Sequence, residues 1–126
     1  VYKRQVHIQP GMSFEQLALH FRAADLVIYP SYYEGQGLIP LEALASGTPV
    51  VTVNQPPLTE MIDDEVGGLF TCGDHEDLAR AVNHSLHHPE ERVKQMEKGR
   101  QRVLDRFTYE HNAAAYEAIY AALLDE

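Results

Sequence analysis

Short apolar runs alternate with helical patterns along this chain, and that alternation limits the folds that it can adopt. Residues 26–29, 49–53 and 68–71 are short and rich in apolar side chains, the pattern of strands that are covered on both faces. Segments with helical spacing and capping residues lie between and after these runs. Strands that alternate with helices join through right-handed crossovers and form a parallel sheet with helices packed on it. The sequence therefore predicts an α/β fold.

Capping residues mark where the expected helices begin and end. Ser13 and Gln16 have the spacing of a capping box, which predicts a helix through Ala24. Gly47 is expected to end a helix over residues 38–46 as a left-handed cap. The other expected elements are a strand over 4–9, a short helix around 58–62, a helix from the cap Asp74 to about His87, a charged surface helix that begins at Pro89 and runs to Arg106, and a last helix after Thr108. Together they predict a Rossmann-like parallel sheet with flanking helices, ending in C-terminal helices.

The last expected helix carries an apolar and aromatic stripe formed by Ala113, Tyr116, Ile119, Tyr120 and Leu123. Such a stripe needs a partner surface, and we expect it to pack on the chain's own sheet. The alternative is that part of the stripe meets another domain.

Length and composition bound the kinds of protein that this can be. The 126 residues, of which 44% are hydrophobic, are enough for one domain with a single core. The formal net charge of −9 argues against a nucleic-acid partner, whose phosphates need a basic surface. The single Cys72 cannot form an internal disulfide, and no signal-like apolar segment is recognised, which favours a reducing, cytoplasmic location. The apolar runs are far shorter than the ~20 residues of a bilayer span, and peripheral membrane contact is left open. Because the sequence begins with Val1 rather than Met, we expect it to be part of a longer protein.

The segment from Glu34 to Glu42, Glu-Gly-Gln-Gly-Leu-Ile-Pro-Leu-Glu, combines two carboxylates with a glycine turn that opens a helix. It follows the apolar run at 26–29, and ligands of open α/β sheets bind where strands end. Gly35 and Gly37 have no side chain and permit positive φ angles, which would let a ligand approach the backbone closely. The free amides at the helix start favour an anion, while each carboxylate can accept hydrogen bonds from a vicinal diol. The pattern predicts a sugar-nucleotide site, with the diphosphate on the amides and one carboxylate each for a ribose and a hexose.

Residues 30–51 resemble the E-x7-E region of retaining GT-B glycosyltransferases of family 4, and Glu34 and Glu42 stand at the two acidic positions. Weaker similarity covers nearly the whole chain, including Glu60, Gly68-Leu69 and Arg106-Phe107-Thr108. The fold of that family has two Rossmann-like domains that face a cleft, and the C-terminal domain binds the donor. The resemblance implies that residues 1–126 are one domain, the later part of the nucleotide-sugar-binding C-terminal domain, and that the N-terminal acceptor domain is absent from this chain.

The resemblance also implies roles for individual residues. Glu34 is expected to be the catalytic residue, Glu42 is expected to hold the ribose, and the base is expected near Gln9, Pro10 and Met12. Contacts to the donor sugar and the diphosphate are expected from Glu34, Gly35, Gln36, Gly37, Leu38 and Ile39. Members of the family are metal-independent, so no metal or cofactor is expected, and the donor is expected to be a UDP-, GDP- or ADP-sugar. Gln36 departs from the family pattern, which usually has an aromatic residue there.

The activity that the resemblance implies belongs to a full-length protein. That protein would transfer a hexosyl unit from a nucleoside-diphosphate sugar to an acceptor, with retention of configuration. The chain alone is expected to be inactive, because the acceptor domain and an earlier basic loop are missing from it. Two alternatives stay open: a GT-B-like sugar-nucleotide epimerase, and a non-catalytic sugar-nucleotide-binding or interaction module. A zinc site at His84, His87 and His88 is not expected, because no further ligand converges on them in the sequence.

Overall fold

A parallel sheet forms the centre of the molecule in the computed structural model, which describes residues 6–124. Within these residues the sheet has three strands, β1 (Val27–Tyr29), β2 (Val50–Val53) and β3 (Gly67–Phe70), in the order β1-β2-β3. Val27 pairs with Val50, and Val50 in turn pairs with Gly67 on its other side. The predicted α/β fold with a parallel sheet is confirmed.

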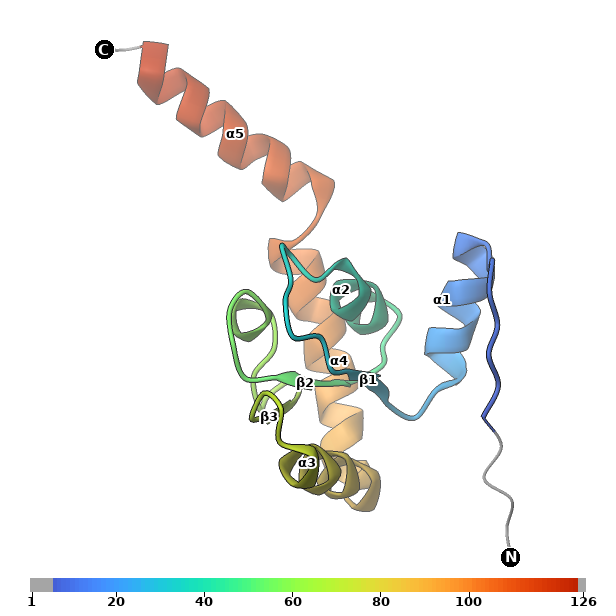
Figure 1. Cartoon of the computed structure of the whole chain (residues 1–126). Coiled ribbons are helices and arrows are strands. Elements are labelled where there is room, and N and C mark those ends of the chain that lie inside the picture. The colour runs from blue at the N-terminus through green and yellow to red at the C-terminus, as the bar shows by residue number, and fades with distance from the viewer. Residues whose placement is uncertain (1–5, 125–126) are drawn as a thin grey trace, which may run out of the picture.

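Helices cover this sheet and connect its strands (Figure 1). The elements are α1 (Phe14–Ala23), α2 (Leu38–Ala45), the single 3-10 turn η1 (Leu58–Glu60), α3 (His75–His87), α4 (Pro89–Arg106) and α5 (Tyr109–Leu124). Ser13 and Gln16 form the predicted capping box, and Gly47 has the expected left-handed conformation with φ of 82°. Figure 1 shows α2 and α3 on opposite sides of the sheet, with α4 running from one to the other.

The prediction of a strand over residues 4–9 is wrong for the residues of this segment that the structure describes. Residues 6–10 have no regular secondary structure, and the side chains of Val6 and Ile8 are exposed. No strand of the described chain lies beside this segment to accept its backbone hydrogen bonds, and a strand is stable only when it is paired. The beginning of the predicted strand, at Arg4 and Gln5, lies outside the described residues.

The core gathers around the central strand. All four residues of β2 are buried, and Leu44 of α2, Leu58 of η1 and Ile62 pack with them almost without exposure. The edge strand β1 is less covered, because Ile28 is 46% exposed. The expectation that both faces of β1 are covered is therefore wrong within the described chain.

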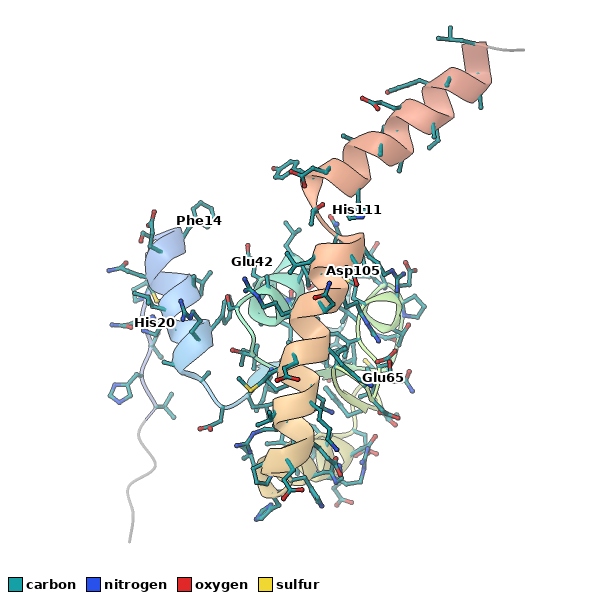
Figure 2. The ribbon with its side chains drawn as sticks, turned by 180° about the vertical axis from the view of Figure 1, so that it is seen from behind. Phe14, His20, Glu42, Glu65, Asp105 and His111 are labelled. Carbon is teal, nitrogen blue, oxygen red and sulfur yellow. The ribbon has the colours of Figure 1, made fainter. Side chains whose placement is uncertain are left out.

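Helix α4 was predicted to lie on the surface, and its outer face does, but its inner face is an integral part of the fold (Figure 2). Gly99 is buried there, and a Cβ atom at this position would lie 2.8 Å from Cδ2 of Leu44. Arg102 is 16% exposed, donates to the carbonyl oxygen of Met61 at 3.2 Å and lies 2.9 Å from Asp63. A glycine and polar side chains thus replace the wide apolar face that usually docks a helix.

Side chains from two helices also reach the outer edge of β3. Gln95 of α4 donates through Nε2 to the carbonyl oxygen of Gly67 at 3.0 Å. Arg80 of α3 donates through Nη2 to the carbonyl oxygen of Leu69 at 3.4 Å. These bonds fasten α3 and α4 to the last strand of the sheet.

Helix α5 projects away from the sheet and the other helices (Figure 1), and none of its residues is buried. Tyr116 and Tyr120 stack on each other with ring centroids 6.4 Å apart, and Ile119 and Leu123 are exposed beside them. The expectation that this stripe packs on the chain's own sheet is wrong, because α2, α3 and α4 already occupy the sheet surface. No helix that residues 6–124 form has the length and apolar character needed to cross a membrane.

Candidate functional site

The carboxyl ends of the three strands meet at one edge of the sheet, and polar side chains connect the segments that follow them. Gln55, which follows β2, donates through Nε2 to the carbonyl oxygen of Tyr32, which follows β1, at 3.1 Å. The same amide nitrogen lies 3.4 Å from Sγ of Cys72, which follows β3. A groove of about 160 Å³ lies here, lined by residues that include Ser31, Glu34 and Gln55. The turn that bears Glu34 therefore lies where open α/β sheets place ligands.

Glu34 is half-buried in this turn and accepts a hydrogen bond at Oε1 from the hydroxyl group of Tyr29, the last residue of β1. This bond, followed by a contribution from the hydroxyl of Ser31, lowers the pKa of Glu34 below its usual value. The same bond to Glu34 raises the pKa of Tyr29. At neutral pH the pair is therefore a carboxylate and a neutral phenol, which makes Glu34 an acceptor for hydroxyl groups rather than a proton donor.

Gly37 is the residue at which the turn becomes α2. Its φ is 87°, as expected, and it is buried. A Cβ atom at this position would lie 2.6 Å from Cδ2 of Leu58 and 3.0 Å from Cε of Met61. Gly35 does not use the freedom that glycine gives it: its φ is not positive, and a Cβ atom there would have no neighbour within 4 Å. Of these two glycines, only Gly37 is restricted to glycine by its conformation and its surroundings, because the buried Leu58 of η1 and the buried Met61 just after it lie directly against this position.

The amino end of α2 is open toward the solvent. Gly37 is the N-cap residue and offers no side chain to the first amides, and no side-chain hydrogen bond from residues 6–124 caps the helix start. Leu38 and Ile39, which follow, are exposed residues, and Pro40 occupies the first turn, where its missing N–H costs no helical hydrogen bond. Unsatisfied amides and the helix dipole make such an end a favourable place for an anion.

Gln36 and Leu38 line a second and larger groove of about 590 Å³, whose far wall is the bend between α4 and α5. That wall includes Arg106, His111 and Tyr116, and Figure 2 shows His111 in the first part of α5. Glu34 lines the smaller groove and not this one. The side chains of Glu34 and Gln36, two residues apart in the turn, therefore lie in different grooves.

Glu42 lies on the second turn of α2 and is half-buried (Figure 2). It lines neither the groove at Glu34 nor the groove at Gln36. The structure thus places Glu34 before the amino end of α2 and Glu42 beyond it, with the first amides of the helix between them. The roles of the two carboxylates stay predictions.

Gln9, Pro10 and Met12 lie in the exposed segment that precedes α1. Oε1 of Gln9 lies 3.1 Å from Nε2 of His20, and both residues line a groove that includes Met12. This groove shares no residue with those beside Glu34 and Gln36, so the predicted contact with the base is not joined to the rest of the site within the described chain.

The three histidines near the end of α3 make other contacts. Nε2 of His84 lies 3.0 Å from Oε2 of Glu91, and the rings of His84 and His88 have centroids 4.1 Å apart. Nδ1 of His87 lies 2.7 Å from the carbonyl oxygen of Asn83. Across residues 6–124, no group of three or more His, Cys, Asp or Glu side chains could hold a metal ion.

Two residues of the site are not among the predicted ones. The sequence indicates Tyr29 only as part of a strand, although its position at the strand end, five residues before Glu34, is a signal for a contact. Nothing in the local sequence around Gln55 indicates that its side chain holds the turn after another strand.

Comparisons with known proteins agree on one family. The sequence profile described as "Glycosyl transferases group 1" matches residues 2–102. The chain is 35% identical over 117 residues to an MMP alpha-(1->4)-mannosyltransferase from Mycolicibacterium hassiacum, covering 91% of this chain and 28% of that protein. It is 36% identical over 118 residues to a D-inositol 3-phosphate glycosyltransferase from Geodermatophilus obscurus, covering 93% of this chain and 25% of that protein.

A solved structure shows the same relationship. The sucrose-phosphate synthase from Thermosynechococcus elongatus superimposes with a TM-score of 0.78 at 35% identity, over 88% of this chain and 28% of that one. The chain therefore spans about a quarter of the length of the curated relatives that it matches.

Proposed function

Because this chain belongs to the group 1 glycosyl transferases, we propose that it is the donor-binding part of a retaining glycosyltransferase of family 4. In the full-length protein, these residues form the later part of the C-terminal domain, and an N-terminal domain supplies the acceptor site. The reaction is the transfer of a hexosyl unit from a UDP-, GDP- or ADP-sugar to an acceptor. The names of the relatives, which include a mannosyltransferase and an inositol-phosphate glycosyltransferase, support sugar transfer as the reaction class.

One observation supports this proposal most directly: an ionised carboxylate lies just before an uncapped helix. Glu34 accepts a hydrogen bond from Tyr29 and keeps a lowered pKa, while the amides at the start of α2 have no capping side chain. A nucleoside-diphosphate sugar presents hydroxyl groups next to a diphosphate. The carboxylate of Glu34 offers an acceptor for the hydroxyl groups, and the positive amino end of α2 offers a site for the diphosphate.

The roles proposed for the residues follow from this chemistry. Glu34 accepts hydrogen bonds from the donor sugar, and the amides of residues 37–39 bind the diphosphate, with Gly35 and Gln36 beside the sugar. Charge that develops on the leaving diphosphate is then stabilised by fixed amide dipoles, without a metal ion. Glu42 holds the ribose, and the segment around Gln9 to Met12 lies toward the base. The chain alone does not transfer sugar, because the water-excluding site needs both domains.

Titration calorimetry of the full-length protein with UDP-, GDP- and ADP-sugars tests the proposal, and each donor is compared with its free nucleoside diphosphate. Glu34→Gln should weaken binding of the sugar nucleotide about tenfold and leave binding of the free nucleoside diphosphate unchanged. The reason is that only the sugar nucleotide carries the hydroxyl groups of the transferred sugar. Glu42→Gln should weaken both about tenfold. Glu97→Gln, on the exposed face of α4, is the matched control and should change neither.

Two results would count against the proposal. A protein that binds none of the three donors would be better described as a non-catalytic interaction module. Equal effects of Glu34→Gln on the sugar nucleotide and on the free nucleoside diphosphate would remove Glu34 from the sugar.

A further inference from the structure

Tyr29 is fixed at both its backbone and its side chain. It ends β1, is half-buried, and its ring packs against the core cluster. Its carbonyl oxygen accepts a hydrogen bond at 2.9 Å from Oγ1 of Thr52, a fully buried residue of β2. A phenol ring that is packed on one side and anchored at its backbone has few alternative rotamers, so its hydroxyl group has a defined position.

The turn that carries Glu34 is fixed as well. The carbonyl oxygen of Tyr32 accepts from Gln55, and the hydroxyl of Ser31 donates to the carbonyl oxygen of Tyr33 at 3.1 Å. The hydroxyl of Tyr29 then reaches across the turn to Oε1 of Glu34. Because the strand end and the turn are both held, this bond fixes the orientation of the carboxylate as well as its charge.

We propose that Tyr29 is a positioning residue of the donor site, which holds Oε1 of Glu34 so that recognition of the donor sugar falls to Oε2. The proposal rests on the function proposed above and sharpens it. A carboxylate with both oxygens available can clamp a vicinal diol, whereas a carboxylate with one oxygen engaged by the protein recognises a single hydroxyl group. The site therefore selects for one sugar hydroxyl at this position and discriminates little at its neighbour.

The surroundings of Glu34 agree with this role. In the described part of the chain, the titratable side chains that meet Glu34 or share its groove are Tyr29 from β1 and Tyr32 and Tyr33 from the turn, with Cys72 joined through Gln55. No Lys, Arg or His side chain lines the groove formed by these described residues. The lowered pKa of Glu34 is therefore due to nearby hydroxyl groups, chiefly that of Tyr29 and secondarily that of Ser31, and not to a neighbouring cation.

The sign of the pH dependence follows from these shifts. The pKa of Glu34 is lowered from its ordinary value by the hydroxyl of Tyr29, so the carboxylate stays ionised to lower pH than an ordinary glutamate. Stabilisation from the pair is present above the usual carboxyl range and is lost as pH falls through the lowered pKa. The raised pKa of Tyr29 means that the phenol stays protonated, and donates, throughout the neutral range.

Tyr29→Phe tests the proposal because it removes only the hydroxyl group and keeps the packed ring. The pKa of Glu34, followed by carbon-13 NMR of its carboxyl group, should rise toward that of an ordinary glutamate in the variant. Affinity for the sugar nucleotide should fall about tenfold, the size expected for one hydrogen bond to a charged group, while affinity for the free nucleoside diphosphate stays unchanged. Tyr33→Phe is the matched control: Tyr33 is 92% exposed, and this change should leave the pKa of Glu34 where it is.

A double-variant cycle separates positioning from a general loss of stability. If Tyr29 acts through Glu34, adding Tyr29→Phe to Glu34→Gln should weaken sugar-nucleotide binding little further. Additive losses, or a pKa of Glu34 that does not move in Tyr29→Phe, would overturn the proposal. A third outcome is that the pKa of Glu34 rises in Tyr29→Phe but the protein binds no sugar nucleotide. This result would overturn the proposed function, and with it the role of Tyr29 in donor binding, while the contact between Tyr29 and Glu34 would stand.

Discussion

Replacing Gly37 by alanine should destabilise the protein for two separate reasons. The first is conformational, because a side chain at φ of 87° is strained by about 1–2 kcal/mol. The second is steric, because the new Cβ atom would lie 2.6 Å from Cδ2 of Leu58, which is itself almost fully buried and has little room to move. Crowding of this kind costs about 1–3 kcal/mol. Alanine also restricts the unfolded chain, which offsets about 0.4–1 kcal/mol. The expected net loss is about 2–4 kcal/mol.

Two further glycines allow the two causes to be measured apart. Gly47 also has a positive φ, of 82°, but its added Cβ atom would meet nothing within 4 Å, so Gly47→Ala should cost only about 1 kcal/mol. Gly35 has neither a positive φ nor a close neighbour, and Gly35→Ala should change stability by less than about 0.5 kcal/mol. Urea unfolding gives the three free energies, provided that the m-values agree. If Gly37→Ala proves no more destabilising than Gly47→Ala, the packing of η1 against the turn does not restrict this position, and the steric argument is refuted.

Two other predictions concern α4 and α5. Arg102→Ala should lower the free energy of unfolding in urea by about 1–3 kcal/mol, because the largely buried guanidinium of Arg102 contacts the carbonyl oxygen of Met61 and the carboxylate of Asp63. Lys98→Ala, which removes an exposed ion pair with Glu65, should change it by less than about 0.5 kcal/mol, and equal losses would contradict this account of how α4 is held. Truncation after Thr108 should change the free energy of unfolding of the remaining residues, measured by thermal unfolding, by less than about 1 kcal/mol, because no residue of α5 is buried. Loss of cooperative unfolding in the truncated protein would show that α5 supports the core.

The parts of the fold that were predictable depend on local signals. Ser13 and Gln16 specify a capping box within four residues, and Gly47 ends α2 because a left-handed residue is needed there. The fully buried β2 is a continuous apolar run in the sequence. These features require no knowledge of the rest of the chain, and for that reason the order of the strands and helices could be read directly.

The parts that were missed depend on contacts between distant segments. The sparse apolar residues of α4 indicate a surface helix, because a helix docked by Gly99 and by Arg102 has no apolar stripe. Within the site, the glycine at 37 was predictable as a turn residue, but its need to remain glycine comes from Leu58 and Met61, over twenty residues away. The partner of Glu34 could not be read from composition, since a tyrosine in a short apolar run is most often a core residue.

The bonds from Gln95 and Arg80 to β3 have a consequence for how the protein behaves among its neighbours. A strand at the border of a sheet presents carbonyl groups that can pair with any extended chain, and this is a common start of aggregation. Here two of those carbonyl groups, on Gly67 and Leu69, are already occupied by an amide and a guanidinium from the protein itself. The same side chains that hold the helices in place therefore also shield this border of the sheet from recruiting a strand of another molecule.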